Sequence, residues 1–268
     1  MYKTILLGLA TILAIGAARL FLAPSPNTDL APETVLLATR TFSFRPAGDY
    51  WQNGQAIDAP SRREQLQPRF EVMKYQVSQS EYARCVADGD CPALSENGTP
   101  RDDMPLTGAS LLDAQLYANW LSRRTGQRWR LPTDLEWVFF AGSRWTDDAL
   151  LIADDGNPAR RWLARYRIEA TRTADAATVQ LRGSHGVNEL GVADLGGNVW
   201  EWTQSCQQRV NLDDQGVSLS HIEACSIRIA EGRHRAAIND FVRDARAGGC
   251  TAGQPPDHLG FRLVRDTP

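Results

Sequence analysis

The sequence predicts an α+β fold in which helices come early in the chain and strands come late. Three segments that each begin with a helix-capping box lie between residues 78 and 141. Short apolar, β-prone runs flank them, and residues 259–265 form another such run near the end of the chain. Long polar stretches without a helical or strand period separate these segments, so we expect much of the domain to be loop.

The first predicted strand covers residues 70–75 and leads directly into the first predicted helix. Ser78 and Glu81 form a Ser-x-x-Glu capping box at the start of that helix. We expect the helix to end near Asp88 and Gly89. Three apolar side chains at helical spacing should face the core: Tyr82, Cys85 and Val86.

Two more helices are predicted by the same kind of start signal. Ser110 and Asp113 open the second helix, and Gly126 suits the position just after its end. Thr133 and Glu136 open the third, after a short strand over residues 128–131. The apolar stripe of the second helix consists of Ala114, Tyr117, Trp120 and Leu121.

In the segment from residue 144 to 187, apolar residues do not recur at helical or strand spacing. We therefore expect this segment to be irregular, apart from one short helix over residues 160–167. The glycine-rich segment 188–202 again has a pattern typical of regular structure. The run over residues 259–265 then predicts a single closing strand.

The N-terminal segment predicts export. A single lysine precedes the apolar run 4–18, and small residues end that run, as in a secretory signal peptide. An uncleaved membrane anchor over residues 5–23 is the alternative, and the sequence leaves both open. We therefore divide the chain into a signal peptide or anchor (1–24), a linker (25–40) and one domain (41–268). The expected location is the periplasm, either soluble or attached to the inner membrane.

The charge balance excludes a nucleic-acid-binding surface of the usual kind. The chain has 29 Lys and Arg against 32 Asp and Glu, a formal net charge of −3. Nucleic-acid binding needs clustered excess positive charge, which this balance does not supply. A protein or peptide is the expected partner, and we expect the chain to be a monomer.

A glycine-rich turn is the most informative local pattern. Consecutive Gly196 and Gly197 permit a sharp turn, and Asp194 and Glu201 place a carboxylate at either end of it. Side-chain and carbonyl oxygens that converge on one point are what calcium binds. Spacing alone favours the alternative, a tight turn before a strand with two solvated acids.

Three motifs occur in order along the chain: RLPTDLEW (130–137), GVADLGGNVWEW (191–202) and GFR (260–262). In this order and spacing they resemble the formylglycine-generating enzyme (sulfatase-modifying factor) family. The segments 77–82 and 113–120 resemble two earlier motifs of the family, so the resemblance covers residues 42–264. It implies a loop-rich fold like that of C-type lectins, with structural calcium. The implied calcium ligands are Asp194, Gly197, the carbonyl of Val199, and Glu201.

The catalytic half of the family pattern is not present. Active members of the family have a Gly-Gly-Ser-aromatic stretch followed by two cysteines that bind copper(I), as soft sulfur ligands do. Here His234 stands at the serine position, while Ala237 and Val242 stand at the cysteine positions. We therefore do not expect copper at the usual site or formylglycine formation by the usual mechanism.

A dense polar set remains in this region, and it is either a ligand site or a salt-bridged surface. The candidate catalytic residues are His234, Arg235 and Cys250. The candidate ligand-binding residues are Trp200, Glu231, Arg233, Asp240 and Arg243.

Five cysteines fit an exported protein. We expect disulfides between Cys85 and Cys91 and between Cys206 and Cys225, the latter across a polar loop over residues 207–224. Cys250 is then left over, and burial is its simplest explanation.

Two functions follow. The first is an oxidoreductase-type maturation factor that acts on a protein or peptide through a non-standard site. The second is a non-catalytic, lectin-like binding or accessory module for a periplasmic partner or metalloenzyme. The missing cysteine pair favours the second, and the polar cluster around His234 favours the first.

Overall fold

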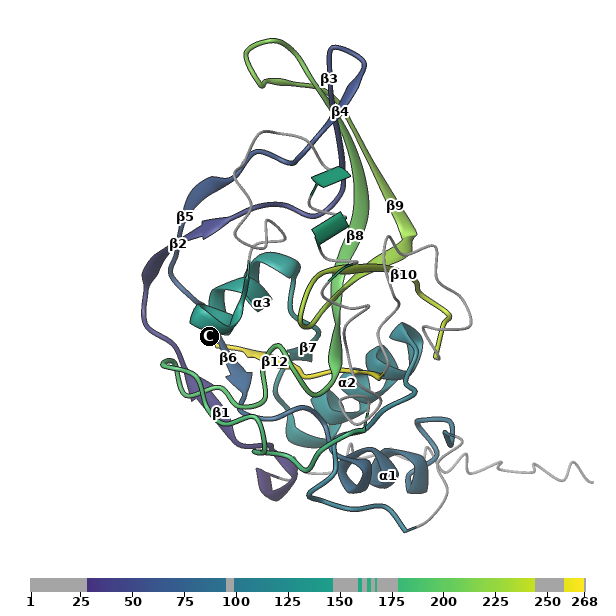
Figure 1. Ribbon diagram of the computed structural model, residues 1–268. Coiled ribbons are helices and arrows are strands. Elements are labelled where there is room, and N and C mark those ends of the chain that lie inside the picture. Colours follow the sequence, from purple (N-terminus) through teal and green to yellow (C-terminus); the bar gives the residue numbers. More distant parts are fainter. Residues whose placement is uncertain are drawn as a thin grey trace, which may run out of the picture.

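The computed structural model describes residues 28–94, 99–146, 159–160, 163–164, 167, 178–243 and 258–267 (Figure 1). The predicted export segment lies outside these residues, and so do four of the eight residues of the helix predicted over residues 160–167. In the described part of the chain, none of the helices has the length and apolar character needed to cross a membrane.

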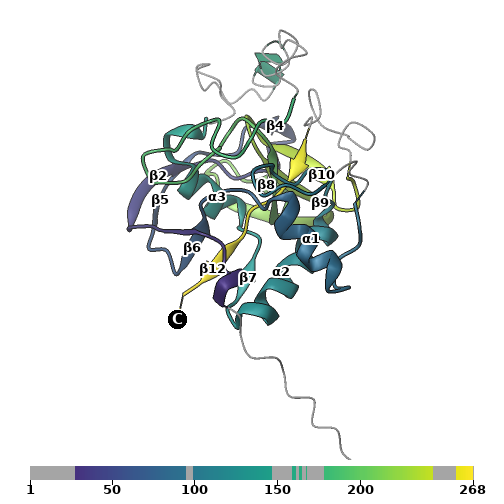
Figure 2. The ribbon, with the colours of Figure 1, turned by 90° about the horizontal axis from the view of Figure 1, so that it is seen from below.

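The three predicted helices are present. They are α1 (Gln79–Ala87), α2 (Leu111–Thr125) and α3 (Asp134–Ala141), with short 3-10 turns at Thr28–Leu30 and Gly142–Arg144. Each has the reciprocal capping box that its sequence predicted, and Gly126 ends α2 in the left-handed conformation with φ 68°. Figure 2 shows α1 and α2 side by side.

A four-stranded antiparallel sheet lies beside these helices in the order β1-β6-β12-β7. Its strands are β1 (Thr34–Leu36), β6 (Phe70–Met73), β12 (Val264–Asp266) and β7 (Trp129–Arg130). A separate two-stranded ribbon consists of β2 (Arg40–Phe44) and β5 (Arg62–Leu66).

The second large sheet is built on one long hairpin, β8 (Trp200–Leu212) and β9 (Ser218–Glu231). The remaining strands are β10 (Ala236–Asn239), β3 (Asp49–Gln52), β4 (Gln55–Ile57) and β11 (Leu259–Gly260). Their order is β10-β9-β8-β3-β4, and β11 pairs with the start of β8. In Figure 1 the tips of β8, β9, β3 and β4 project from the top of the body.

The hydrophobic core lies below this projection in two main clusters. One joins α1 and α2 to the root of the long hairpin, through Tyr117, Trp120, Trp202 and Phe261. The other packs α3 against the four-stranded sheet and the β2 strand, through Trp137 and Phe139 among others. The root of the hairpin is therefore held by the core, while its outer half is not.

Three expectations about the strands are wrong. The predicted polar loop over residues 207–224 is most of the long hairpin. The single closing strand is two short strands in different sheets, because Arg262 between them points into the core. Six strands also precede α1, so strands are not confined to the end of the chain.

Candidate functional site

The glycine-rich turn before β8 is organised by Asp194. Its backbone is left-handed (φ 57°), and its carboxylate oxygens accept hydrogen bonds from the backbone N–H groups of Gly183 and His185. A Cβ at Gly197 would lie 2.6 Å from the imidazole ring of His185, so the turn needs glycine for close packing at that position. Asp194 thus holds the segment around residues 183–185 against the start of β8.

Glu201, one residue into β8, forms a buried ion pair with Arg262. The Arg262 Nε and Nη2 atoms donate to the two carboxylate oxygens at 2.6 and 2.7 Å, and the side chains are 0% and 1% exposed for Arg262 and Glu201. The Trp137 indole N–H donates to one oxygen at 2.9 Å, and the Gln76 amide donates to the other at 2.7 Å. Each carboxylate oxygen therefore has two donors.

This arrangement does not fit the predicted calcium site of Asp194, Gly197, Val199 and Glu201. Both oxygens of Glu201 are already satisfied, and a cation bound there would lie beside the Arg262 guanidinium. The Asp194 oxygens likewise accept backbone N–H groups. One nearby oxygen, Gln76 Oε1, is buried without a hydrogen-bond partner, but calcium takes six to eight oxygen ligands. Both side-chain oxygens of Glu201 have protein donors in this structure, and its role as a calcium ligand stays a prediction.

A second buried cluster joins Glu231, Arg235 and Asp134. Arg235 Nε donates to Glu231 at 2.6 Å and to Asp134 at 3.1 Å, and its Nη1 donates to the Arg45 carbonyl at 2.7 Å. Burial raises the pKa of Glu231 well above its ordinary value; Arg235 acts against this rise, and Asp134 adds to it. One guanidinium between two buried carboxylates favours a proton held at Glu231.

Helix α3 connects these two clusters. Asp134 and Trp137 are three residues apart, so they lie on one face of the helix. Asp134 reaches the Arg235 cluster, and Trp137 reaches Glu201. Glu201 and Glu231 are themselves directly opposite each other across β8 and β9. The polar residues predicted to form a site therefore contribute to the interface between α3 and the hairpin root.

Trp200, Arg233 and His234 form a compact group next to this interface. The Trp200 indole N–H donates to the His234 carbonyl at 3.1 Å, and the two rings lie 5.4 Å apart edge to face. The Arg233 guanidinium lies over the Trp200 ring at 5.6 Å. Trp200 and His234 are buried, so neither presents an open surface to a ligand.

The remaining candidates lie toward α2. Arg243 makes a two-pronged ion pair with buried Asp113, with both distances 2.8 Å, while its own side chain is 52% exposed. Asp240 is half-buried, and its backbone carbonyl accepts from the N–H of Leu111. Of the two residues predicted to stand at the family's cysteine positions, Ala237 lies in β10 and Val242 is buried. Cys250 lies outside the described residues.

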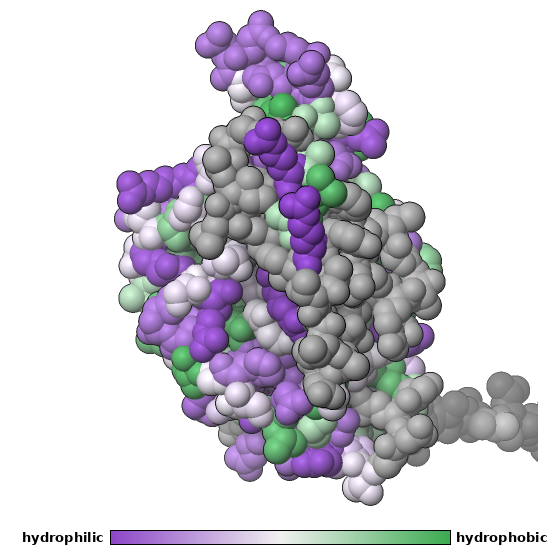
Figure 3. Space-filling model, viewed as in Figure 1, coloured by the Kyte–Doolittle hydropathy of each residue, from purple (hydrophilic) through white to green (hydrophobic). Residues whose placement is uncertain are grey.

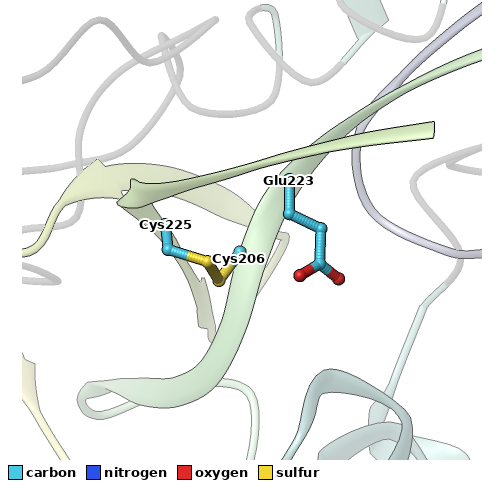
Figure 4. A group of neighbouring side chains, drawn as sticks. All are labelled: Cys206, Glu223 and Cys225. Atoms are coloured by element: carbon cyan, nitrogen blue, oxygen red, sulfur yellow. A yellow bond between two sulfur atoms is a disulfide. The ribbon is translucent and has the colours of Figure 1, made fainter.

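Both predicted disulfides are confirmed. Cys85–Cys91 closes the end of α1, and Cys206–Cys225 links β8 to β9. In the described ranges, the one group of three or more metal-ligating side chains within reach of each other is Cys206, Glu223 and Cys225 (Figure 4). The two cysteines of this group are joined to each other as a disulfide.

Sequence reasoning missed the partners that complete both ion-pair clusters. Three of these partners are buried polar residues: Gln76, Asp134 and Arg262. The sequence around each predicts a helix cap, a turn or a strand, and does not indicate burial of the polar side chain. The signal for Arg262 was its place in the third motif, Gly-Phe-Arg. Gln76 and Asp134 carried no signal beyond their positions next to a capping box.

The outer half of the long hairpin was also missed, and its residues 218–225 are exposed. Strand β10 pairs with residues 227–230 of β9, while residues 218–225 have no described strand on that side. These residues are exposed, including Leu219 (71%) and Ile222. Figure 3 shows the hairpin tip as a mostly hydrophilic projection with apolar side chains below it.

A groove of about 400 Å³ lies at this tip. Its lining residues are Trp51, Asn53, Gly54, Asn211, Leu212, Asp213, Asp214 and Leu219. Apolar side chains from β3, β8 and β9 thus lie next to two carboxylates at the hairpin turn.

Comparison with known proteins gives a consistent result. The family model described as "Sulfatase-modifying factor enzyme 1-like domain" matches residues 21–267. The Inactive C-alpha-formylglycine-generating enzyme 2 of Bos taurus is 29% identical over 173 residues, which is 60% of this chain and 50% of that protein. The Formylglycine-generating enzyme of Streptomyces coelicolor is 30% identical over 183 residues, which is 63% of this chain and 54% of that protein.

The chain thus spans about half the length of these relatives. It also matches the Serine/threonine-protein kinase pkn1 of Chlamydia pneumoniae at 27% identity, over 60% of this chain and 24% of that protein. Among solved structures, PvdO from Pseudomonas aeruginosa has a TM-score of 0.54 at 20% identity, over 88% of this chain and 95% of that one. This similarity supports the α+β fold.

Proposed function

The chain belongs to the sulfatase-modifying factor enzyme 1-like family, and from this premise we propose that it is an exported recognition protein that does not form formylglycine. Its ligand is an extended segment of a protein or peptide, bound along the open edge of β9. Family membership alone does not decide between catalysis and binding, because the matched relatives include both an active and an inactive formylglycine-generating enzyme.

The packing of the predicted catalytic residues supports binding over the oxidoreductase alternative. Glu231, His234 and Arg235 are buried. The acid and the arginine make an ion pair with each other, as part of the interface between α3 and the hairpin root. The positions at which the sequence predicts the family's cysteines hold an alanine and a valine, which supply no thiolate for copper. Side chains that are buried and paired in this way are not accessible to a substrate, which supports a role in stabilising the fold.

The open edge of β9 is the observation that carries the proposal. Eight consecutive exposed residues, 218–225, have a described strand on one side only. An exposed strand edge is a template for an added strand, whose main-chain hydrogen bonds give affinity. Specificity then comes from pockets that receive alternate side chains.

The groove at the hairpin tip indicates which side chains fit. Trp51, Leu212 and Leu219 favour an apolar side chain, and Asp213 and Asp214 favour a neighbouring Lys or Arg. We therefore propose that the bound segment carries a large apolar residue next to a basic residue. The two disulfides support a location in an oxidising compartment such as the periplasm.

Selection from a library of linear peptides tests this function on the full chain. We expect enriched peptides with the apolar-basic pattern, and Leu219→Arg should weaken their binding at least tenfold. Leu112→Arg is the matched control, because Leu112 is a similarly exposed leucine on α2. N-methylation of alternate peptide nitrogens should also weaken binding at least tenfold, since it removes main-chain donors.

The proposal is wrong if no peptide is enriched, or if binding is insensitive to both Leu219→Arg and N-methylation. The oxidoreductase alternative has its own test in metal content and oxygen consumption. Stoichiometric copper or iron together with oxygen uptake by the purified protein would favour that alternative.

A further inference from the structure

The two disulfides of this protein differ in their surroundings. Cys85–Cys91 is buried in the core, with Cys85 0% exposed. Cys206–Cys225 lies in the long hairpin, where Cys206 is half-buried and Cys225 is exposed. The β8–β9 ladder changes register on both sides of Cys206, so regular pairing is interrupted at the disulfide. A small thiol in solution can reach Cys225 far more easily than the buried pair.

An arginine lies against the inner sulfur of this disulfide, that of Cys206. Arg228 Nη1 donates to Cys206 Sγ at 3.1 Å and to the Gln204 carbonyl at 2.6 Å. Within the described residues, the buried Nε of Arg228 has no hydrogen-bond partner. A positive charge next to a sulfur stabilises the thiolate that forms when a disulfide opens. Cys206 is therefore the favoured leaving group.

The carboxylate of Glu223 lies close to both sulfurs of the same disulfide. An oxygen of Glu223 and the sulfurs of Cys206 and Cys225 are within 4.8 Å of one another (Figure 4). In the open form, Glu223 disfavours negative charge on the nearby sulfurs, and Arg228 offsets this at Cys206. The proton of the dithiol form is therefore expected on Cys225 and the negative charge on Cys206.

We propose that Cys206–Cys225 is a redox-active disulfide that oxidises a dithiol in a peptide or protein by thiol–disulfide exchange. A substrate thiolate attacks Cys225 Sγ, the bond between the two cysteines breaks, and Cys206 leaves as a thiolate beside Arg228. The second substrate thiolate then attacks the substrate sulfur of this mixed disulfide and releases Cys225.

The products are a substrate disulfide and a reduced Cys206–Cys225 pair. Two electrons pass from the substrate to the pair, and the two protons of the substrate thiols go to the pair and to solvent. The protein disulfide is itself the oxidant, and a small disulfide such as oxidised glutathione restores it. This activity does not depend on strand addition at the β9 edge.

Redox titration of the intact chain tests the proposal with Cys85–Cys91 as an internal control. The oxidised protein is equilibrated in glutathione buffers of increasing reducing strength, free thiols are alkylated, and peptides are mapped by mass spectrometry. We expect half-reduction of Cys206–Cys225 at a glutathione redox ratio at least tenfold less reducing than Cys85–Cys91 requires. Equal resistance of the two disulfides would overturn the proposal.

Variants of Arg228 test whether this arginine promotes thiol–disulfide exchange, or whether the exposure of Cys225 alone explains the reactivity of the disulfide. With a synthetic two-cysteine peptide as substrate, Arg228→Gln should slow thiol oxidation about tenfold, while Arg228→Lys retains most of the rate. In the reduced protein, alkylation of Cys206 should need a higher pH in Arg228→Gln than in the wild type. An unchanged rate and an unchanged alkylation profile would contradict the assigned role of Arg228.

Trapping of the mixed disulfide identifies the attacked sulfur. With the oxidised (disulfide) form of the two-cysteine peptide as probe, exchange runs in reverse: Cys206→Ser should accumulate a peptide adduct on Cys225, because Cys206 is no longer there to displace the peptide. Cys225→Ser should give at least fivefold less adduct on the less accessible Cys206. The reverse pattern would refute the proposed direction of attack.

Discussion

Replacement of Glu201 by glutamine tests whether an arginine or a cation compensates the carboxylate at the start of β8. Glu201 and Arg262 share two hydrogen bonds of 2.6 and 2.7 Å in the core. At an effective dielectric constant of about 20, two charges about 4 Å apart attract by roughly 4 kcal/mol. Removal of one partner of a buried pair lowers stability by about 3–5 kcal/mol, because the other charge stays buried without compensation.

For a domain of this size, that loss corresponds to a fall in Tm of roughly 6–20 °C. Thermal and urea unfolding, followed by circular dichroism, measure it. The double variant Glu201→Gln/Arg262→Met should lose less than the sum of the two single variants, since it leaves no unpaired charge.

The decisive control is a chelator. We expect EDTA to leave the Tm of the wild type unchanged, because the oxygens of Glu201 are occupied by Arg262, Trp137 and Gln76. A wild-type Tm that falls in EDTA and recovers in calcium, with no such response in Glu201→Gln, would falsify this account and restore the calcium site.

Three further changes probe other parts of the fold. Because the pKa of Glu231 is raised above its ordinary 4.5 in the folded protein, wild-type stability should fall as pH rises from that value toward the folded-state pKa. In urea titrations from pH 5 to 8, Glu231→Gln should therefore show a shallower decline; an equal slope would contradict the raised pKa. Replacing both Cys85 and Cys91 by alanine should cost at least about 2 kcal/mol, measured by urea unfolding, since the bridge closes a short loop. A Cβ at Gly232 would lie 2.5 Å from the Trp200 ring, so Gly232→Ala should destabilise by about 1–3 kcal/mol in thermal unfolding. A neutral result would mean that the ring can move.

The helices could be predicted from the sequence because their signals are local. Each capping box is a contact between residues three apart, such as Ser78 with Glu81 or Ser110 with Asp113. Such contacts form without knowledge of the rest of the fold. The disulfides were predicted for a similar reason, since Cys85 and Cys91 flank a turn.

The long hairpin could not be predicted in the same way. Residues 207–209 and 218–225 are exposed or half-buried, so no alternation of apolar and polar side chains marks them as strands. Their pairing is fixed by the root of the hairpin, where Trp202 and Ala230 lie opposite each other in the core. Polarity alone therefore indicated a loop where the structure has strands.

The partners of the predicted site residues could not be predicted for a different physical reason. Polar residues in a motif suggest solvent, a ligand or a metal, and the sequence does not tell which charges will meet. Glu201 meets Arg262 across 61 residues, and Arg235 meets Asp134 across 101. Pairs so distant in sequence become visible only when the fold brings the segments together.

The two buried acids at the hairpin root explain why the hairpin needs both arginines. Glu201 and Glu231 are directly opposite across β8 and β9, and two ionised carboxylates in that position would repel each other. Arg262 compensates the charge of Glu201, Arg235 bonds to Glu231, whose raised pKa favours its protonated form, and α3 supplies a further partner to each cluster. Substitutions at this root should therefore change stability, while substitutions at Leu219 or Arg228 should change binding or exchange and leave the unfolding transition nearly unchanged. A root variant that altered peptide affinity as strongly as it altered stability would show that the two halves of the hairpin are coupled.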